Sequence, residues 1–312
     1  MDSIFAQAIA EKYFGIQAGA EVLPSERDYN FRLTSVSGEQ FVLKVANVFE
    51  PPEVLEAQTA ALTYLETQVS FCPRIVPSSS GAALTEVRSA NGATYLVRVV
   101  RYIPGVPLGT LESHSPRLLR DLGRKLGRLD RVLLDFDHPG AHREFYWDLA
   151  NGSRILEEYG PQIKTDRLRE VVLGCREHLS LPVAKLRRSV IHGDANDYNV
   201  LVDQEHDEVV GLIDFGDMIY SYTVGDLAVA IAYVVLGKPD AKAAAAPVIE
   251  GYVEELPLTK NELDALWTLV RLRLCMSVCI AAHQQAQQPE NDYLGISQKL
   301  IAETLPRLLA TE

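Results

Sequence analysis

The sequence predicts an α+β protein with two lobes, a small β-rich lobe over residues 1–103 and a larger, mainly helical lobe over residues 104–312. Three observations lead to this prediction. Apolar residues alternate with polar ones in much of the first third, which is typical of strands, and recur every three or four positions in most of the remainder, which is typical of helices. Between the two patterns, residues 102–109 (YIPGVPLG) contain two prolines and two glycines, a composition that favours a hinge.

The first lobe is expected to contain two hairpins and two helices. The N-terminal helix is expected to end at Gly15, because glycine readily adopts the left-handed conformation that closes a helix. The second helix follows a pair of prolines, which suit the first turn of a helix. The expected elements are helices over 1–15 and 51–69, a hairpin of 29–36 with 40–46, and a hairpin of 83–89 with 93–102 that turns at Ala90-Asn91-Gly92.

The second lobe is expected to be helical except for one hairpin. Leucines recur at helical spacing from Leu118 to Leu133, and Thr259 with Glu262 forms a capping box before an apolar run. Further helices are expected over 161–180, 224–236, 240–254, 259–288 and 291–310. The hairpin is expected to consist of two short strands at 199–202 and 209–213.

Composition limits the classes of function. The chain has 312 residues, 47% of them apolar, and a net charge of −12, which argues against broad contact with nucleic acid and mildly favours a cationic small substrate. We expect no membrane span and no signal peptide, since no uninterrupted apolar run approaches about 18 residues and the chain starts without basic residues. The four cysteines form no CxxC pair and fit buried free thiols better than a zinc site. We therefore expect a cytoplasmic protein without a nucleic acid or membrane partner; its oligomeric state is left open.

Two motifs in the second lobe point to phosphoryl transfer, VIHGDANDYN at 190–199 and LIDFGD at 212–217. They bracket the expected hairpin, so Asn199 and Asp214 are expected to come close together. A carboxylate and an amide oxygen suit Mg²⁺, which keeps its other positions for water and phosphate oxygens. Asp194 on the preceding loop is placed to accept a proton from a hydroxyl group. The spacing H-x-D-x-x-x-x-N followed by D-F-G is that of kinase catalytic and metal loops; the competing interpretation is an acidic turn between two strands.

A kinase also needs a cation for the nucleotide phosphates, and Lys44 is the candidate. Strand alternation places this lysine on the same face as Val42 and Ala46, so it points toward something other than open solvent. Glu56 in the following helix is the expected ion-pair partner, and Glu53 is a competing one. The alternative is a structural lysine, whose aliphatic side chain lies along the face of the strand while its ammonium group reaches solvent.

With these residues in place, nearly the whole chain resembles the aminoglycoside phosphotransferase-like small-molecule kinases. The wording of NDYN and DFGDM brings it nearest to the hydroxylysine kinase subgroup and to the phosphotransferase domains fused to some class-III aminotransferases. The segments that carry the resemblance are 25–31, 41–45, 55–62, 145–149, 190–202, 211–218, 224–233 and 269–274.

The resemblance implies a bilobal, protein-kinase-like fold that uses Mg²⁺ and takes ATP or GTP as co-substrate. It implies that Asp194 is the catalytic base, that Asn199 and Asp214 hold Mg²⁺, and that Lys44 with Glu56 steadies the phosphates. It also implies that Asp226 braces the catalytic loop, to which His192 belongs, through the loop's backbone amides. An N-cap is the simpler interpretation of Asp226, and both roles are compatible.

Two departures from the protein-kinase pattern are visible. The loop expected over the phosphates, LPSERDYNF, lacks the Gly-x-Gly-x-x-Gly motif, so Ser25 and backbone amides would have to serve there. The chain also runs directly from Asp214 to the helix near Val224, without a long activation segment or an Ala-Pro-Glu motif. We therefore expect a small-molecule acceptor rather than a protein.

The acceptor is expected to be a small hydroxylated amine or amino acid, with 5-hydroxylysine as the best candidate. Asp217, Trp147 and Asp148 would suit an ammonium group, because they offer an aromatic face and carboxylates. Arg271 or Arg273 would suit a carboxylate, which is either that of the acceptor or that of an Asp or Glu of the protein. Homoserine, choline, ethanolamine and aminoglycosides remain alternative acceptors, and a silent nucleotide-binding protein or an interaction protein with this fold are the alternative functions.

Overall fold

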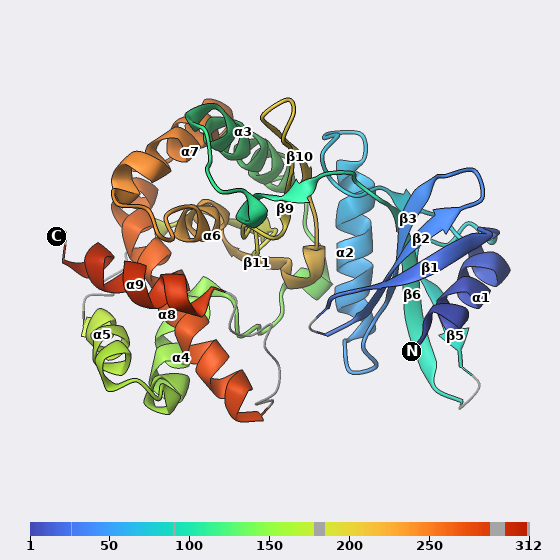
Figure 1. Cartoon of the computed structure of the whole chain (residues 1–312), viewed down its shortest axis with the longest axis horizontal. Helices are drawn as coiled ribbons and strands as arrows, with labels where there is room; N and C mark the ends of the chain where they lie inside the picture. Colours follow the sequence, from blue (N-terminus) through green and yellow to red (C-terminus); the bar gives the residue numbers. More distant parts are fainter. Residues whose placement is uncertain (26, 90–91, 178–184, 288–296, 311–312) are drawn as a thin grey trace. The chain divides into compact units, whose positions relative to one another are not determined.

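A computed structural model of the chain describes residues 1–25, 27–89, 92–177, 185–287 and 297–310 (Figure 1). The chain forms two compact units. The first comprises Met1–Gly105 with His138–Ala141 and Val210–Ile213, and the second comprises Val106–Asp137, His142–Val209 and Asp214–Glu312. The boundary predicted after residue 103 lies close to the change at Gly105, but the two short segments that join the first unit from later in the sequence were not predicted.

The first unit contains one antiparallel sheet with helices packed against it. The strand order is β1-β2-β3-β6-β4, and β5 also pairs with β6. The elements are α1 (Ser3–Phe14), β1 (Ala18–Leu23), β2 (Tyr29–Ser35), β3 (Gln40–Val45), α2 (Pro52–Leu65), β4 (Ile75–Val76), β5 (Thr85–Arg88) and β6 (Thr94–Arg101). The predicted hairpins and helices are present, but β1 was not expected; the turn predicted at Ala90–Asn91 lies outside the described residues.

The two faces of this sheet differ in chemistry. Apolar residues of β2, β3 and β6, such as Phe31 and Val99, form a buried core with α1. The alternate residues point to the other face, where Arg98 of β6 donates a hydrogen bond from Nη2 to Gln58 Oε1 of α2 at 2.6 Å. Lys44 lies on this second face, directly opposite Arg98 in the β3–β6 register.

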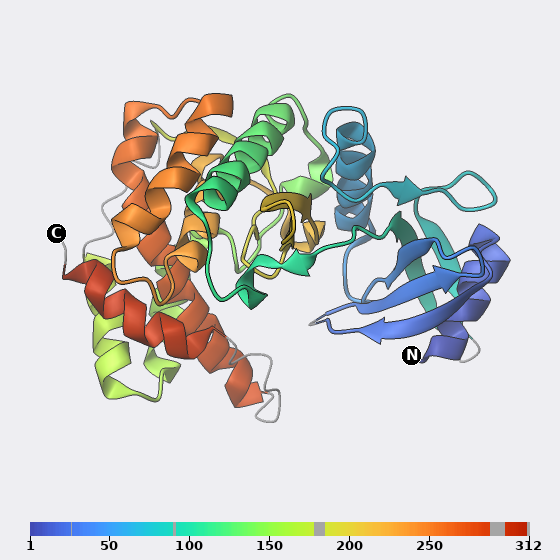
Figure 2. The ribbon, with the colours of Figure 1, turned by 45° about the horizontal axis from the view of Figure 1, so that its top comes forward.

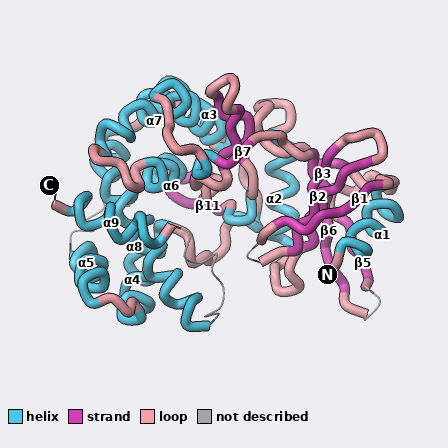
Figure 3. The backbone as a smooth tube through the Cα atoms, in the orientation of Figure 1, coloured by secondary structure: helices cyan, strands magenta, loops and turns pink. Residues whose placement is uncertain are grey.

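The second unit is mainly helical (Figure 3). Its helices are α3 (Pro116–Leu133), α4 (Gly152–Tyr159), α5 (Asp166–Glu177), α6 (Val224–Val234), α7 (Ala241–Glu255), α8 (Lys260–Gln287) and α9 (Gln298–Leu309). By length and composition α8 could cross a membrane, but 78% of its most apolar window is buried inside the structure. We therefore interpret α8 as the core helix of this unit.

Short strands in the second unit hold the loops that carry the motifs. β7 (Val106–Pro107), within the predicted hinge, pairs with β9 (Val200–Asp203), and β9 also neighbours β10 (Glu208–Leu212). β8 (Arg188–Ile191) pairs with β11 (Ile219–Tyr222), and Ile191 lies opposite Ile219. This last pair was not predicted, yet it brings the residues that follow β8 beside those that precede β11.

Helices α3 and α7 pack with their backbones in close contact, side by side in Figures 1 and 2. A Cβ atom added to Gly123 would lie 1.9 Å from the carbonyl oxygen of Val248, and one added to Gly251 would lie 2.0 Å from that of Arg120. Only glycine permits this approach, and neither backbone can retreat without moving its helix.

We predict that Gly251→Ala lowers the free energy of unfolding by about 2 kcal/mol or more, because the added methyl group forces α3 and α7 apart. Thermal or denaturant unfolding measures the change. Gly174→Ala is the matched control: Gly174 is exposed in α5 with nothing within 4 Å of its added Cβ. This control should stabilise the protein by about 0.5–1 kcal/mol through helix propensity, and equal effects of the two substitutions would contradict the packing argument.

Candidate active site

The loop after β8 is fixed by two backbone hydrogen bonds to one buried carboxylate. Asp226, in the first turn of α6, accepts from the backbone N–H of His192 at 2.8 Å and of Gly193 at 2.6 Å. Gly193 has a φ of +80°, and a Cβ there would lie 2.7 Å from the carbonyl oxygen of Asp217, so glycine is required. The resulting turn presents Asp194, and this is the bracing role that the resemblance implied for Asp226.

Asp194 carries the best-connected carboxylate of the site. Its Oδ1 accepts from Nη2 of Arg273 at 2.6 Å, and its Oδ2 accepts from the Nδ2 atoms of Asn196 and Asn199, each at 2.8 Å. Burial raises the pKa of Asp194 to about 8, against the opposing effect of the Arg273 cation. The three donors oppose this rise, because hydrogen bonds to a carboxylate favour its ionised form.

Asn199 and Asp214 present oxygen atoms that suit a metal ion. Nδ2 of Asn199 donates to the backbone oxygen of Asp194 at 2.9 Å and to its carboxylate, so the amide oxygen of Asn199 is turned away from Asp194. Asp214 is exposed and has a φ of +64°, an uncommon conformation for a residue other than glycine and one that often marks a functional site. Its charge acts on Asp194, so the two carboxylates belong to one site. The donor set therefore fits Mg²⁺, which needs only one or two protein oxygens besides water and phosphate.

Arg273 enters the site from the middle of α8. Its side chain is 2% exposed, and its guanidinium lies over the ring of Trp147 at 4.2 Å and near Tyr233 at 5.7 Å. The sequence left open whether an arginine of this helix binds the acceptor or a carboxylate of the protein. For Arg273 the structure answers this question, because its partner is Asp194.

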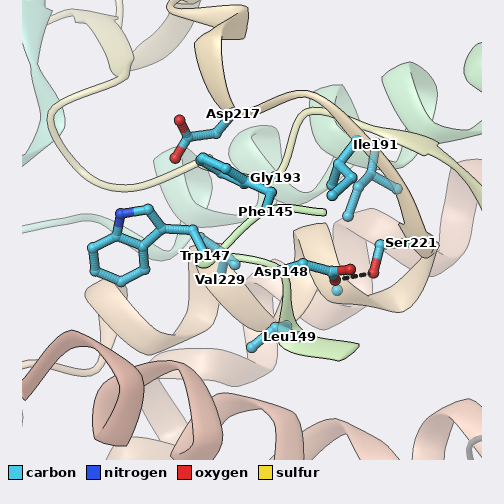
Figure 4. A pocket seen from close by; sticks show the side chains of 11 residues that line it. Phe145, Trp147, Asp148, Leu149, Ile191, Gly193, Asp217, Ser221 and Val229 are labelled. Carbon is cyan, nitrogen blue, oxygen red and sulfur yellow. Dashed lines mark hydrogen bonds between the residues drawn. The ribbon is translucent and has the colours of Figure 1, made fainter. Parts of the chain in front are cut away.

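The other residues expected around the acceptor have different surroundings (Figure 4). Asp217 is buried beside the catalytic loop, and its charge acts on both Asp194 and Arg273. Asp148 lines the same pocket as Asp217 and Trp147, and its Oδ1 accepts from the Ser221 hydroxyl and from the Ala150 backbone N–H. Arg271 donates from Nε to the backbone oxygen of Trp267 in its own helix at 3.2 Å. Asp217 is thus the predicted acceptor residue whose charge acts on Asp194.

In the first unit the structure does not form the expected pair of Lys44 with Glu56. Glu56 is exposed and lies about 200° around α2 from Gln58, the residue that faces the sheet. The neutral amide of Gln58 instead faces the sheet and accepts from Arg98, which lies opposite Lys44 in the register. Ser25 is exposed two residues after the end of β1, and the phosphate-binding roles of Ser25 and Lys44 stay predictions.

The comparison with known proteins agrees with this site. Residues 20–260 match the phosphotransferase enzyme family. The chain belongs to this family. It is 31% identical over 318 residues to a hydroxylysine kinase of Danio rerio, covering 96% of this chain and 89% of that protein. It is 32% identical over 324 residues to a hydroxylysine kinase of Mus musculus, covering 94% of this chain and 85% of that protein.

Solved structures of other kinases share the fold of this phosphotransferase. A microcompartment-associated aminopropanol kinase superposes with a TM-score of 0.77 at 18% identity, covering 99% of this chain and 98% of that one. An amicoumacin kinase in complex with AMP-PNP, Ca²⁺ and Ami superposes with a TM-score of 0.75 at 17% identity, covering 98% of this chain and 94% of that one. The phosphotransferase is therefore a small-molecule kinase with a kinase-like fold.

A second buried carboxyl group supports Asp226 from behind. Asp130 of α3 is fully buried, and it accepts a hydrogen bond from the Tyr252 hydroxyl of α7 at 2.6 Å. Burial, together with the neighbouring charge of Asp226, raises the pKa of Asp130 well above its usual range. A protonated Asp130 can donate a hydrogen bond to Asp226, whose carboxylate accepts from the two loop amides.

Several residues of the site were not found from the sequence. Asn196 could have been noticed, since it is a polar residue two positions after Asp194. Asp130 and Tyr252 carry no comparable signal, because each is one polar residue within an amphipathic helix and their contact depends on how α3 packs against α7.

We predict that Asp130→Asn does not destabilise the protein at pH 7, since an amide can still donate to Asp226 and accept from Tyr252 and, unlike the carboxyl group, needs no proton to do so. Asp130→Leu should cost about 2–4 kcal/mol, because Asp226 and Tyr252 then lose a buried partner. Denaturant unfolding of both variants measures the difference. Because folding raises the pKa of Asp130, its contribution to stability is complete only below the pKa of the unfolded chain, and it is lost as the pH rises from there through the folded-state value. A loss of stability from Asp130→Asn as large as that from Asp130→Leu would contradict a protonated Asp130, because an amide would then fail to replace the carboxyl group.

Proposed function

We propose that this phosphotransferase transfers the γ-phosphate of ATP or GTP, with Mg²⁺, to the hydroxyl group of a small hydroxylated amine, and that 5-hydroxylysine is the best candidate acceptor. The observation that supports this most is that a half-buried Asp194, held by three hydrogen-bond donors, shares one site with Asn199 and Asp214. Phosphoryl transfer depends mainly on positioning and on neutralising charge, and this group of side chains supplies both.

In the proposed reaction the acceptor hydroxyl lies against Asp194 and in line with the γ-phosphorus atom. The hydroxyl oxygen forms the new bond to phosphorus, the bond from phosphorus to the β–γ bridging oxygen breaks, and the hydroxyl proton passes to Asp194. Asn199 and Asp214 would hold Mg²⁺, which supplies positive charge to the phosphate oxygens when it is bound. The hydrogen bonds from Asn196, Asn199 and Arg273 keep the Asp194 carboxylate in place.

The charges of the site favour an acceptor that carries an ammonium group. Asp194, Asp214 and Asp217 bring three carboxylates together, and the guanidinium of Arg273 offsets one of them. Asp217 is the proposed partner of the ammonium group. The names of the two hydroxylysine kinases and of the aminopropanol kinase all describe amines that carry a hydroxyl group, and this supports the same class of acceptor.

A panel of acceptors tests the proposal. The purified protein would be given ATP or GTP with 5-hydroxylysine, lysine, 1-amino-2-propanol, ethanolamine, choline, homoserine or kanamycin, with and without Mg²⁺. Nucleoside diphosphate release and ³¹P NMR of the product are measured. We expect Mg²⁺-dependent formation of a phosphate monoester with 5-hydroxylysine and none with lysine, which lacks the hydroxyl group. Turnover of kanamycin or choline alone would refute the choice of acceptor. Nucleoside diphosphate release that none of the acceptors increases would refute the proposed function.

We predict that Asp194→Asn lowers kcat by about 10² or more and leaves nucleotide affinity nearly unchanged, because the lost carboxylate acts on the acceptor hydroxyl. Steady-state kinetics and titration with a fluorescent nucleotide measure the two quantities. Asp166→Asn removes an equal charge from a side chain that is 81% exposed in α5, and it should keep the parental kcat. Near-parental turnover of Asp194→Asn would overturn the assignment of the base.

We predict that Asp217→Asn raises the KM of ammonium-bearing acceptors by about tenfold and leaves the KM of the nucleotide unchanged, because it removes a buried negative charge near the acceptor but retains the side-chain shape. Initial rates at varied acceptor and varied nucleotide concentrations measure both constants. An increase confined to the nucleotide KM would place Asp217 on the nucleotide side of the site instead.

A further inference from the structure

Arg273 lies where a charged side chain is unfavourable unless a specific partner holds it. It belongs to the buried stretch of α8, between Leu272 and Leu274, and its own side chain is 2% exposed. The Asp194 side chain is 18% exposed, and the two charged groups meet at 2.6 Å. Breaking such a buried pair leaves an uncompensated charge, so this contact constrains both side chains strongly.

The hydrogen bonds of Asp194 leave one place for a further donor. A carboxylate offers about four lone-pair sites, two on each oxygen. Oδ2 already accepts from Asn196 and Asn199, whereas among the described residues Oδ1 accepts only from Nη2 of Arg273. The remaining site is therefore on Oδ1, the oxygen that Arg273 contacts.

We propose that Arg273 is a positioning residue for phosphoryl transfer: it holds Asp194 Oδ1 so that the remaining lone pair of that oxygen faces the acceptor hydroxyl. The inference depends on the proposed function of Asp194 as the base. Without Arg273, the carboxylate is held by donors to Oδ2 alone and can rotate about them. Misplacement of a reacting group by about 1 Å can cost about 10² in rate.

The proposal gives Trp147 a different role from the one expected from the sequence. The guanidinium carbon of Arg273 lies 4.2 Å from the centre of the indole ring, within the range of a cation–π contact. One face of the indole ring is therefore occupied by Arg273. In this proposal Trp147 acts on the reaction through Arg273, by fixing the plane of the guanidinium group.

Kinetics of Arg273 and Trp147 variants test the proposal. Arg273→Met should lower kcat about 10²-fold while acceptor KM and nucleotide Kd change less than about threefold. Arg273→Lys keeps the charge but lacks the planar fork, so it should lose about tenfold in kcat. Trp147→Leu should also lower kcat without raising acceptor KM. Arg120→Met removes an arginine whose side chain is 51% exposed and ion-paired at the surface, and it should match the parent in every constant.

Two measurements on one double variant, Asp194→Asn with Arg273→Met, separate positioning from a purely structural role. In the Asp194→Asn background, Arg273→Met should lower the residual kcat by less than about twofold. The effects of two substitutions do not add when the two residues act as one unit. A thermal unfolding cycle with the same two substitutions checks the ion pair without any acceptor: the double variant should melt higher than Arg273→Met alone, since it no longer buries an unpaired carboxylate.

Specific results would overturn the inference. A folded Arg273→Met protein with parental kcat would refute positioning, and so would equal losses from Arg273→Met in the parental and Asp194→Asn backgrounds. A rise in KM confined to acceptors that bear a carboxylate, with kcat retained, would make Arg273 a substrate-binding residue instead. If the parental protein phosphorylates none of the acceptors, the proposed function is refuted and this inference with it. If the parental protein does phosphorylate an acceptor and one of the preceding results is found, only the inference about Arg273 is refuted.

Discussion

The second unit is organised around the half-buried carboxylate of Asp194, the group that we propose as the base, and around the contacts that hold it still. Burial raises the pKa of Asp194 to about 8 and so favours its protonated form. A cation from α8 and two amides from its own loop oppose this effect. The arrangement explains why a charged arginine is retained inside an otherwise apolar core helix.

The support of that carboxylate extends through several layers of the fold. The close backbone contact of α3 and α7 at Gly123 and Gly251 belongs to the same helix pair that brings Tyr252 to Asp130. Asp130 in turn meets Asp226, which holds the amides of the catalytic loop. The mispacking of two helices would thus be transmitted to the site through a short series of hydrogen bonds, although none of these helix residues contacts a reactant.

The sequence was most informative where the chemistry lies within one short segment. The spacing of Asp194, Asn199 and Asp214 predicted that these residues share one site, since all three lie on one hairpin and its flanking loops, and the structure places Asp194 in contact with Asn199 and within reach of the Asp214 charge. The sequence was least informative for contacts between elements: the β8–β11 pair was missed because two short strands far apart in the sequence form it. Glu56 was expected to face Lys44 because the sequence shows which residues lie on α2 but not which side of the helix faces the sheet. Arg273 is an intermediate case, because its need for a carboxylate was apparent but the identity of that carboxylate required the fold.

The most direct measurement is a crystal structure of the protein with Mg²⁺, a non-hydrolysable nucleotide and 5-hydroxylysine. It should show the acceptor hydroxyl within about 3 Å of Asp194 Oδ1, with the Asn199 amide oxygen and the Asp214 carboxylate on the metal and the Asp194–Arg273 contact intact. An acceptor hydroxyl bound elsewhere, or an Asn199 amide turned so that its oxygen no longer faces the metal, would contradict the proposed arrangement of the site.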